Sequence, residues 1–314
     1  MNVQAEKKPS GESPEWLRRK ERGSHFWLRV MRWLSLTLGR RLSRTVLYGI
    51  ALYFVLAASA ARKASQAYLA RILGRPATWL EVYRHILTFS STIHDRVYLL
   101  NNRHDLFDIR ISGAESLHAL HAGNHGFFLF GAHLGSYEVL RTLVRDHPEL
   151  KVCSVMYPEN ARQVNSALAA INPHVMQDII ALGQPDSMIA IHHKLKEGAM
   201  VGILADRAVG PDQYISLPFL GSPARFPTGP FRMAAMLRRP IYFMAGLHQG
   251  GNRYDIEFEL LSDFSAPTSP AERDAEVREA LEKYVRALER HCQSAPFNWF
   301  NFYDFWEQTQ HDNV

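Results

Sequence analysis

The stretch Gly-Phe-Phe-Leu-Phe-Gly-Ala-His-Leu-Gly-Ser-Tyr-Glu-Val-Leu-Arg, residues 126–141, decides the fold. Its first half is a short apolar run that ends at Gly131, which is typical of a strand buried in a parallel sheet. Its second half has a helical pattern that begins near Gly135. The stretch therefore predicts a strand, a turn and a helix, with His133 on the turn.

Short apolar runs and helical patterns alternate on both sides of this stretch. The predicted strands are 109–112, 127–132, 152–157, 178–181, 200–205, 241–245 and 254–260, and the predicted helices are 64–73, 79–100, 134–145, 161–170, 187–196, 228–237 and 272–292. The alternation favours an α/β fold with a mostly parallel central sheet flanked by helices.

The positive charge of the chain is concentrated near its N-terminus. The net charge is +5, but residues 1–75 hold 15 Lys and Arg against four Glu, so the other 239 residues carry −6. A nucleic-acid-binding domain would carry its basic residues on the folded body. The acidic body therefore argues against a nucleic-acid partner.

The N-terminal segment suggests a membrane surface as a partner. Residues 1–24 are polar and predict a flexible tail, whereas 26–38 mix Trp, Leu and Arg as interfacial helices do. Residues 45–61 are 17 uncharged residues, the lower limit for crossing a bilayer. We predict a membrane-associated helical segment over 25–75 that lies in or dips into the membrane, followed by an α/β domain over 76–314. A clean transmembrane span and a buried core helix remain the alternatives.

His133 and Glu138 are the candidate catalytic pair. Residues five apart on a regular helix diverge by about 140°, so the two side chains meet only if His133 lies on the turn and Glu138 projects back from the first helical turn. A carboxylate on one imidazole nitrogen fixes the tautomer and leaves the other nitrogen free to accept a proton. The alternative is that Glu138 only caps the helix.

Four sequence blocks, found in a fixed order along the chain, indicate which family of proteins the chain resembles. They are Gly-Ala-His-Leu-Gly-Ser-Tyr-Glu (131–138), Val-Gly-Ile-Leu-Ala-Asp-Arg (201–207), Leu-Pro-Phe-Leu-Gly-Ser-Pro with the later Thr-Gly-Pro (217–223 and 228–230), and Arg-Pro-Ile (239–241). With these blocks the chain resembles, over about residues 25–306, the late acyltransferases of lipid A biosynthesis, the lauroyl/myristoyl branch of the glycerolipid acyltransferase superfamily.

The resemblance implies a membrane-associated enzyme of the cytoplasmic side of the inner membrane. It would transfer a fatty acyl chain from an acyl carrier protein or acyl-CoA thioester to a hydroxyl or amine of a lipid or glycolipid acceptor. No cofactor is implied, and His118, His121 and His125 lack the carboxylate or thiol partners of a metal site. The implied catalytic residues are His133 and Glu138, and the candidate substrate-binding residues are Asp206, Arg207, Arg162, Phe219, Gly221 and Arg225.

Several alternatives stay open at this stage. The family usually has Asp-Gln or Asp-His where this chain has Asp206-Arg207, so the acceptor could be another lipid, such as an aryl-polyene or amino-acid lipid precursor. Asp206 and Arg207 could also form a structural ion pair. A lipid thioesterase with the same pair and a non-catalytic membrane-bound module are the rival functions.

The aromatic residues of 299–306 are too many for an ordinary exposed tail. We expect them to pack beside the His133 turn with the indoles of Trp299 and Trp306 toward the lipid interface, or else to lie in the core.

Overall fold

The computed structural model describes residues 25–115, 125–140, 144, 147, 150–172, 178–184, 186–207, 213–266 and 269–306. The predicted tail, 1–24, and two of the histidines weighed as metal ligands, His118 and His121, lie outside these residues. The described helices are α2 (His25–Ala57), α3 (Ser59–Leu73), α4 (Trp79–Leu99), α7 (Pro158–Ile171), α8 (Ser187–Lys196), α9 (Gly229–Leu237) and α10 (Pro270–Ser294), with short 3-10 turns η1 (His104–Leu106) and η2 (Tyr137–Val139).

The centre of the molecule is a seven-stranded sheet with the order β1-β9-β8-β2-β5-β3-β4. Its strands are β1 (Asp108–Ser112), β2 (Phe127–Gly131), β3 (Val152–Met156), β4 (Asp178–Ala181), β5 (Met200–Leu204), β8 (Ile241–His248) and β9 (Arg253–Ser262). Neighbours are parallel except for β8 and β9, which form an antiparallel hairpin. The predicted α/β fold with a mostly parallel sheet is confirmed.

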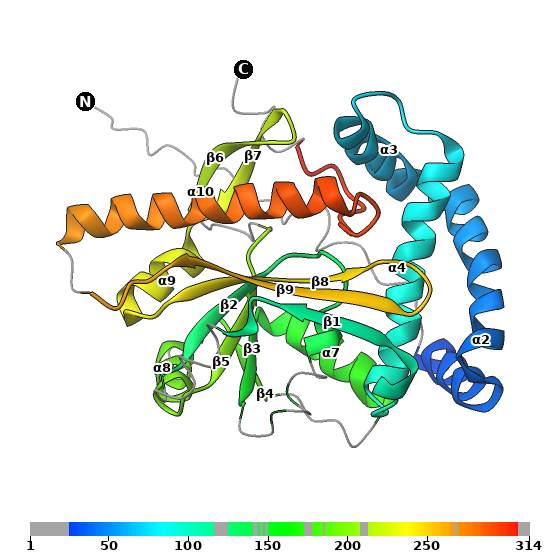
Figure 1. Ribbon diagram of the computed structural model, residues 1–314, viewed down its shortest axis with the longest axis horizontal. Coiled ribbons are helices and arrows are strands. Elements are labelled where there is room, and N and C mark those ends of the chain that lie inside the picture. The colour runs from blue at the N-terminus through cyan, green and yellow to red at the C-terminus, as the bar shows by residue number, and fades with distance from the viewer. Residues whose placement is uncertain are drawn as a thin grey trace, which may run out of the picture.

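Strand β2 lies at the centre of the sheet and is buried on both faces. Its even and odd residues point into different cores: Phe128 and Phe130 belong to the core that includes α10, whereas Phe127 and Leu129 belong to the other. This period-two division explains why the strand is a continuous apolar run. Figure 1 shows α10 running along one face of the sheet and α7 lying on the other side, and the buried residues of α8 belong to the same core as those of α10.

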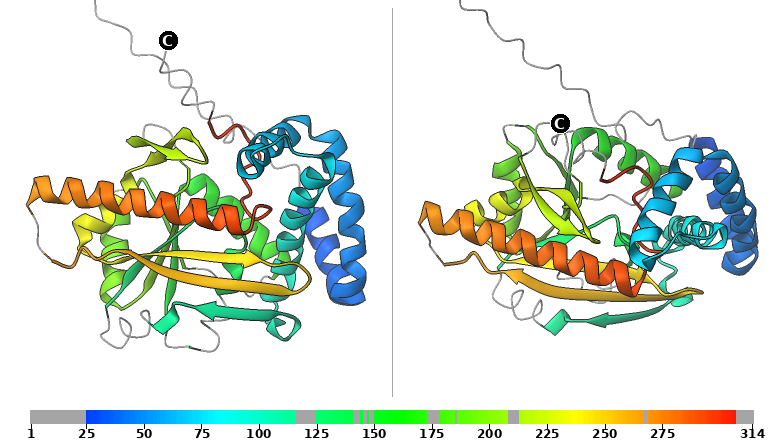
Figure 2. Two further views of the ribbon diagram at one scale, coloured as in Figure 1. Left: turned by 45° about the horizontal axis from the view of Figure 1, so that its top comes forward. Right: turned by 90° about the horizontal axis from the view of Figure 1, so that it is seen from above.

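The helices α2, α3 and α4 gather at one end of the molecule, beside the sheet (Figures 1 and 2). Helix α2 packs against α4 through a stripe of buried residues spaced four apart, Ser43, Leu47, Ala51 and Val55. Another face of α2 carries exposed apolar side chains, including Leu42, Val46, Leu52, Tyr53 and Leu56. Among the described residues no helix by itself is long and apolar enough to cross a membrane, but α2 and α3 pass that test as a pair bent by 95°.

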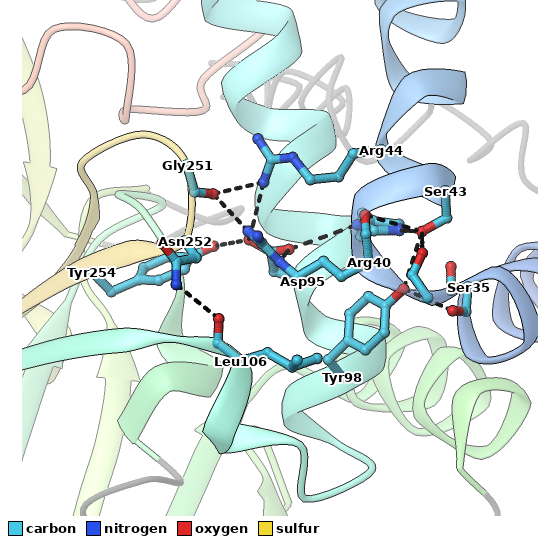
Figure 3. Close-up of polar contacts among 12 residues, drawn as sticks. Ser35, Arg40, Ser43, Arg44, Asp95, Tyr98, Leu106, Gly251, Asn252 and Tyr254 are labelled. Carbon is cyan, nitrogen blue, oxygen red and sulfur yellow. Dashed lines mark hydrogen bonds and ion pairs between the residues drawn. The ribbon is translucent and has the colours of Figure 1, made fainter.

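A buried ion cluster fastens α2 to the body (Figure 3). The carboxylate of Asp95 on α4 is fully buried and accepts two hydrogen bonds of 2.8 Å from Arg40 and one of 2.9 Å from the hydroxyl of Tyr254. Arg40 and Arg44 both donate to the carbonyl of Gly251 in the β8–β9 turn. Burial raises the pKa of Asp95, but His94 and the two arginines outweigh it and hold that pKa below its usual range.

The structure differs from the predicted elements in two places. The predicted helix 134–145 is replaced at its start by a turn, in which Gly135 has a φ of +66°, and by the 3-10 turn η2. A hairpin of β6 (Tyr214–Phe219) and β7 (Ser222–Pro227) was not predicted. Its three prolines and the tight Leu220-Gly221 turn, with positive φ at both residues, hide the strand pattern in the sequence.

Candidate active site

The candidate site lies at the carboxyl ends of β2 and β5, the edge where ligands bind in open parallel sheets. The two strands pair in register, with Gly131 opposite Leu204. His133 and Asp206 each come two residues after this pair. The parallel register therefore brings the two side chains together from positions 73 residues apart.

Asp206 binds the imidazole of His133. The distance from His133 Nδ1 to Asp206 Oδ1 is 2.8 Å, and the backbone N–H of His133 donates to Oδ2 at 3.1 Å. Since a carboxylate only accepts, the proton of a neutral imidazole lies on Nδ1, and the lone pair of Nε2 is available. The His133 side chain is 31% exposed, so the imidazole is open to solvent on part of its surface.

The carboxylate of Asp206 is fully buried and has four donors. Besides the two from His133, the indole Nε1 of Trp299 and the side-chain amide of Asn301 both donate to Oδ2 at 3.2 Å. Burial alone would raise the pKa of Asp206, but the attraction and hydrogen bonds of His133 and the charge of Arg207 outweigh it, so the pKa lies well below its ordinary value. Asp206 is therefore an anion.

The surroundings of His133 keep its imidazole neutral. Desolvation lowers its pKa, and the nearby Arg207 lowers it further, while Asp206 acts in the opposite direction. A neutral imidazole with a free Nε2 has the form that a general base requires.

The turn that carries His133 is held from both sides. Gly135 meets Gly246 of β8 so closely that a Cβ on Gly135 would lie 2.0 Å from the Gly246 carbonyl oxygen, and the N–H of Ser136 donates to the same oxygen at 2.8 Å. Only glycine fits this approach and this positive φ. On the other side the segment 298–300 pairs with the turn.

The predicted contact between Glu138 and the imidazole is wrong. Glu138 lies on η2 and is 7% exposed, and its Oε1 forms an ion pair of 2.8 Å with Nε of Arg96 on α4. Its other polar partner is the hydroxyl of Ser136, at 3.4 Å. Because the glycine turn and the 3-10 geometry direct this carboxylate toward α4, it ties the His133 turn to that helix, and Asp206 occupies the position next to the imidazole.

Two other predicted site residues, Arg207 and Phe219, lie next to the His133–Asp206 pair. Arg207 donates to the side-chain oxygen of Asn301 at 2.7 Å, and its guanidinium lies 5.3 Å from the centre of the Tyr303 ring. Phe219 is fully buried, with its ring 5.3 Å from that of Trp299. Both residues therefore contact the segment that touches Asp206.

For three predicted substrate-binding residues, the described part of the structure places the side chain or turn on neighbouring elements and gives no contact with His133. Arg225 lies on β7 with its guanidinium 4.3 Å from the centre of the Tyr214 ring, and Gly221 is exposed in the β6–β7 turn. Arg162 is exposed on the first turns of α7, which follows β3 at the same edge of the sheet. Their part in substrate binding stays a prediction.

Sequence reasoning did not assign Trp299 and Asn301 to the site. The aromatic density of 299–306 was a signal, and its expected position beside the His133 turn agrees with the structure. The expectation that the indoles face a lipid interface is wrong, because Trp299 is fully buried and Trp306 is 4% exposed. Both indoles pack in the main core with Phe219 and Phe305.

Fold and site together define an α/β protein that holds a histidine–carboxylate pair at the carboxyl edge of a mostly parallel sheet. The family described as bacterial lipid A biosynthesis acyltransferase matches residues 13–307. The chain therefore belongs to this family, as the four sequence blocks indicated, and is an acyltransferase. No curated protein is similar enough to the chain to count as a match.

Proposed function

We propose that this acyltransferase moves a fatty acyl chain from a carrier thioester to a hydroxyl or amine of a lipid or glycolipid acceptor, with His133 as general base. The observation that carries the proposal is the bond between His133 Nδ1 and the buried anion of Asp206, which leaves Nε2 free at a partly exposed position. The donor is the thioester of an acyl carrier protein or of coenzyme A. The acceptor is a lipid A precursor or a related lipid.

In the proposed reaction Nε2 of His133 takes the proton of the acceptor while the acceptor oxygen or nitrogen attacks the thioester carbonyl. Asp206 stabilises the imidazolium that forms. The new C–O or C–N bond replaces the C–S bond, and the imidazolium returns its proton to the leaving thiolate. Glu138 supports the reaction by holding the His133 turn on α4 through Arg96.

The test is product analysis with the purified full-length enzyme. Labelled acyl carrier protein or acyl-CoA thioester is supplied with a lipid A precursor, with another amphipathic lipid, or without acceptor. We expect acylated lipid only when an acceptor is present and the His133 side chain is intact. Free fatty acid formed equally with and without acceptor would identify a thioesterase, and no turnover under any condition would contradict the proposal.

We further propose that the exposed apolar surface of α2, with Trp79 and Leu80 at the start of α4, lies in the cytoplasmic leaflet of the inner membrane. Trp79 is 56% and Leu80 74% exposed, and basic residues such as the exposed Arg41 and Lys63 accompany this surface. Basic side chains beside exposed Trp and Leu suit an anionic lipid surface. Because the opposite stripe of α2 packs on α4, the helix would enter the lipid without leaving the body.

We expect the triple variant Leu42→Glu, Leu52→Glu, Leu56→Glu to lose more than tenfold of its binding to vesicles that contain phosphatidylglycerol. Each leucine is exposed, so its substitution leaves the core unchanged, and burying one such side chain in lipid stabilises binding by roughly 1.5–3 kcal/mol. Flotation of the protein with the vesicles measures the binding. Ile189→Glu is the matched control, since Ile189 is 69% exposed on α8. Equal flotation of the triple variant and the control would contradict the proposal.

A further inference from the structure

The segment Asn298–Asn301, which follows α10, forms part of the wall of the site. The backbone N–H of Phe300 donates to the carbonyl of His133 at 2.7 Å, and the N–H of Gly135 donates to the carbonyl of Asn298 at 2.8 Å. These two bonds make the segment a short antiparallel partner of the His133 turn, with Leu134 opposite Trp299. The backbone of the segment therefore fixes where His133 lies.

Two side chains of the same segment fix the carboxylate that binds His133. The indole N–H of Trp299 and the amide N–H of Asn301 both donate to Oδ2 of Asp206, and both side chains are at most 1% exposed. With Oδ2 occupied in this way, Oδ1 is directed at Nδ1 of His133. The amide oxygen of Asn301 accepts from Arg207, which fixes the orientation of the amide.

Residues of the N-terminal helices α3 and α4 hydrogen-bond to Trp299, directly or through one another. The imidazole of His85 on α4 is fully buried, with Nε2 2.9 Å from the carbonyl of Trp299 and Nδ1 2.8 Å from the hydroxyl of Ser65 on α3. Burial lowers the pKa of His85 to about 4, so the ring is neutral. Since a carbonyl only accepts, Nε2 donates to Trp299 and Nδ1 accepts from Ser65.

We propose that Trp299 and Asn301 are positioning residues for the acyl transfer reaction, that they act on His133 through Asp206, and that Ser65 and His85 connect them to α3. The inference rests on the proposed function of His133 as general base. It assigns the aromatic segment a role in orienting the base, in addition to its packing in the core.

The two donors also adjust the strength of the base. Hydrogen bonds from Trp299 and Asn301 spread the negative charge of Asp206, which weakens its pull on the proton of His133 Nδ1. Loss of either donor strengthens that pull and raises the pKa of His133. The other groups with an electrostatic effect on this pair include Arg207, Tyr284 and Cys292 of α10, and Tyr303.

The test compares Trp299→Phe with Trp306→Phe in the full-length enzyme. Both indoles are buried in the same core, but Nε1 of Trp306 has no hydrogen-bond partner among the described residues. The control substitution therefore removes a similar volume and no bond to the site. We expect Trp299→Phe to lower kcat about tenfold, to change KM less than twofold, and to move the acidic limb of the pH–rate profile to higher pH.

Trp306→Phe is expected to keep the kcat and the pH profile of the wild type, whatever its effect on thermal unfolding. Asn301→Ala, which removes the other donor and leaves a smaller cavity, is expected to change kcat and the pH limb in the same direction as Trp299→Phe. If Trp299→Phe and Asn301→Ala both kept the kcat and the acidic limb of the control, the segment would only be packing and the inference would be wrong.

A second readout separates this inference from the proposed function. The ¹⁵N chemical shifts of the His133 ring report its tautomer and pKa without substrate. If the wild type transferred no acyl group, the proposed function would fail, while a pKa of His133 that rises in Trp299→Phe and not in Trp306→Phe would still support the hydrogen-bond chain. Equal pKa values in all three proteins would overturn it.

Discussion

Replacing Asp206 by asparagine is expected to lower kcat by roughly 10²–10⁴-fold, because the substitution selects the wrong tautomer of His133. Three donors point at Oδ2, from the His133 backbone, Trp299 and Asn301. The carbonyl oxygen of the new amide must take that position, which turns its NH₂ group toward Nδ1. Nδ1 then has to accept, so the proton moves to Nε2 and the base is blocked.

The measurement is single-turnover acyl transfer together with the ¹⁵N shifts of the His133 ring. Glu138→Gln is the informative comparison, since it alters the ion pair with Arg96 without touching the imidazole. Its His133 ring is expected to keep the proton on Nδ1 and to keep its pKa, whatever happens to the rate. An Asp206→Asn enzyme with wild-type turnover, or a tautomer that changes only in Glu138→Gln, would restore Glu138 as the partner of the base.

His133→Ala is expected to reduce acyl transfer by roughly 10²–10⁴-fold, the usual contribution of a general base. The fold should persist, because the side chain is partly exposed and its polar partner Asp206 keeps the other three donors. Added imidazole is expected to restore part of the rate by occupying the vacated space. Thermal unfolding provides the control for stability, and near wild-type turnover in the purified variant would exclude His133 as the base.

The acidic limb of the wild-type pH–rate profile is expected below the ordinary histidine value of about 6.5. Desolvation and Arg207 lower the pKa of His133, so the imidazole stays neutral, and the base active, down to a lower pH than a free histidine allows. A limb above that value would contradict the electrostatics of the site.

Much of the fold follows from the sequence because its signals are local. All seven strands of the main sheet match apolar runs that Gly, Pro or polar residues interrupt, and α8 matches its predicted bounds, 187–196. The apolar runs of β2 and β5 are each followed by a polar residue two positions on, and this marked both His133 and Asp206 as candidate site residues. Their pairing depends on the register Gly131–Leu204, and no single strand contains that information.

Glu138 illustrates the limit of local reasoning. A spacing of five residues is compatible with contact across a turn, but the direction of the side chain is decided by two remote features. Gly135 packs closely against the backbone of Gly246 on β8, and Arg96 on α4 forms an ion pair with the carboxylate of Glu138. Trp299 and Asn301 could not be assigned for the same reason, since their partner Asp206 is more than 90 residues away in the chain.

The bond between His85 and Trp299, which joins residues 214 positions apart, has a consequence for how the chain acquires its shape during synthesis. Domains fold as the chain emerges, N-terminal parts first. Helices α2 to α4 are synthesised before every strand of the sheet. His85 on α4 therefore cannot bond to Trp299 until the chain beyond α10 has been synthesised. Closing so long a loop costs chain entropy and delays this contact relative to local ones. Under the membrane contact proposed for α2, the nascent protein would therefore be able to bind lipid before His133 is ordered.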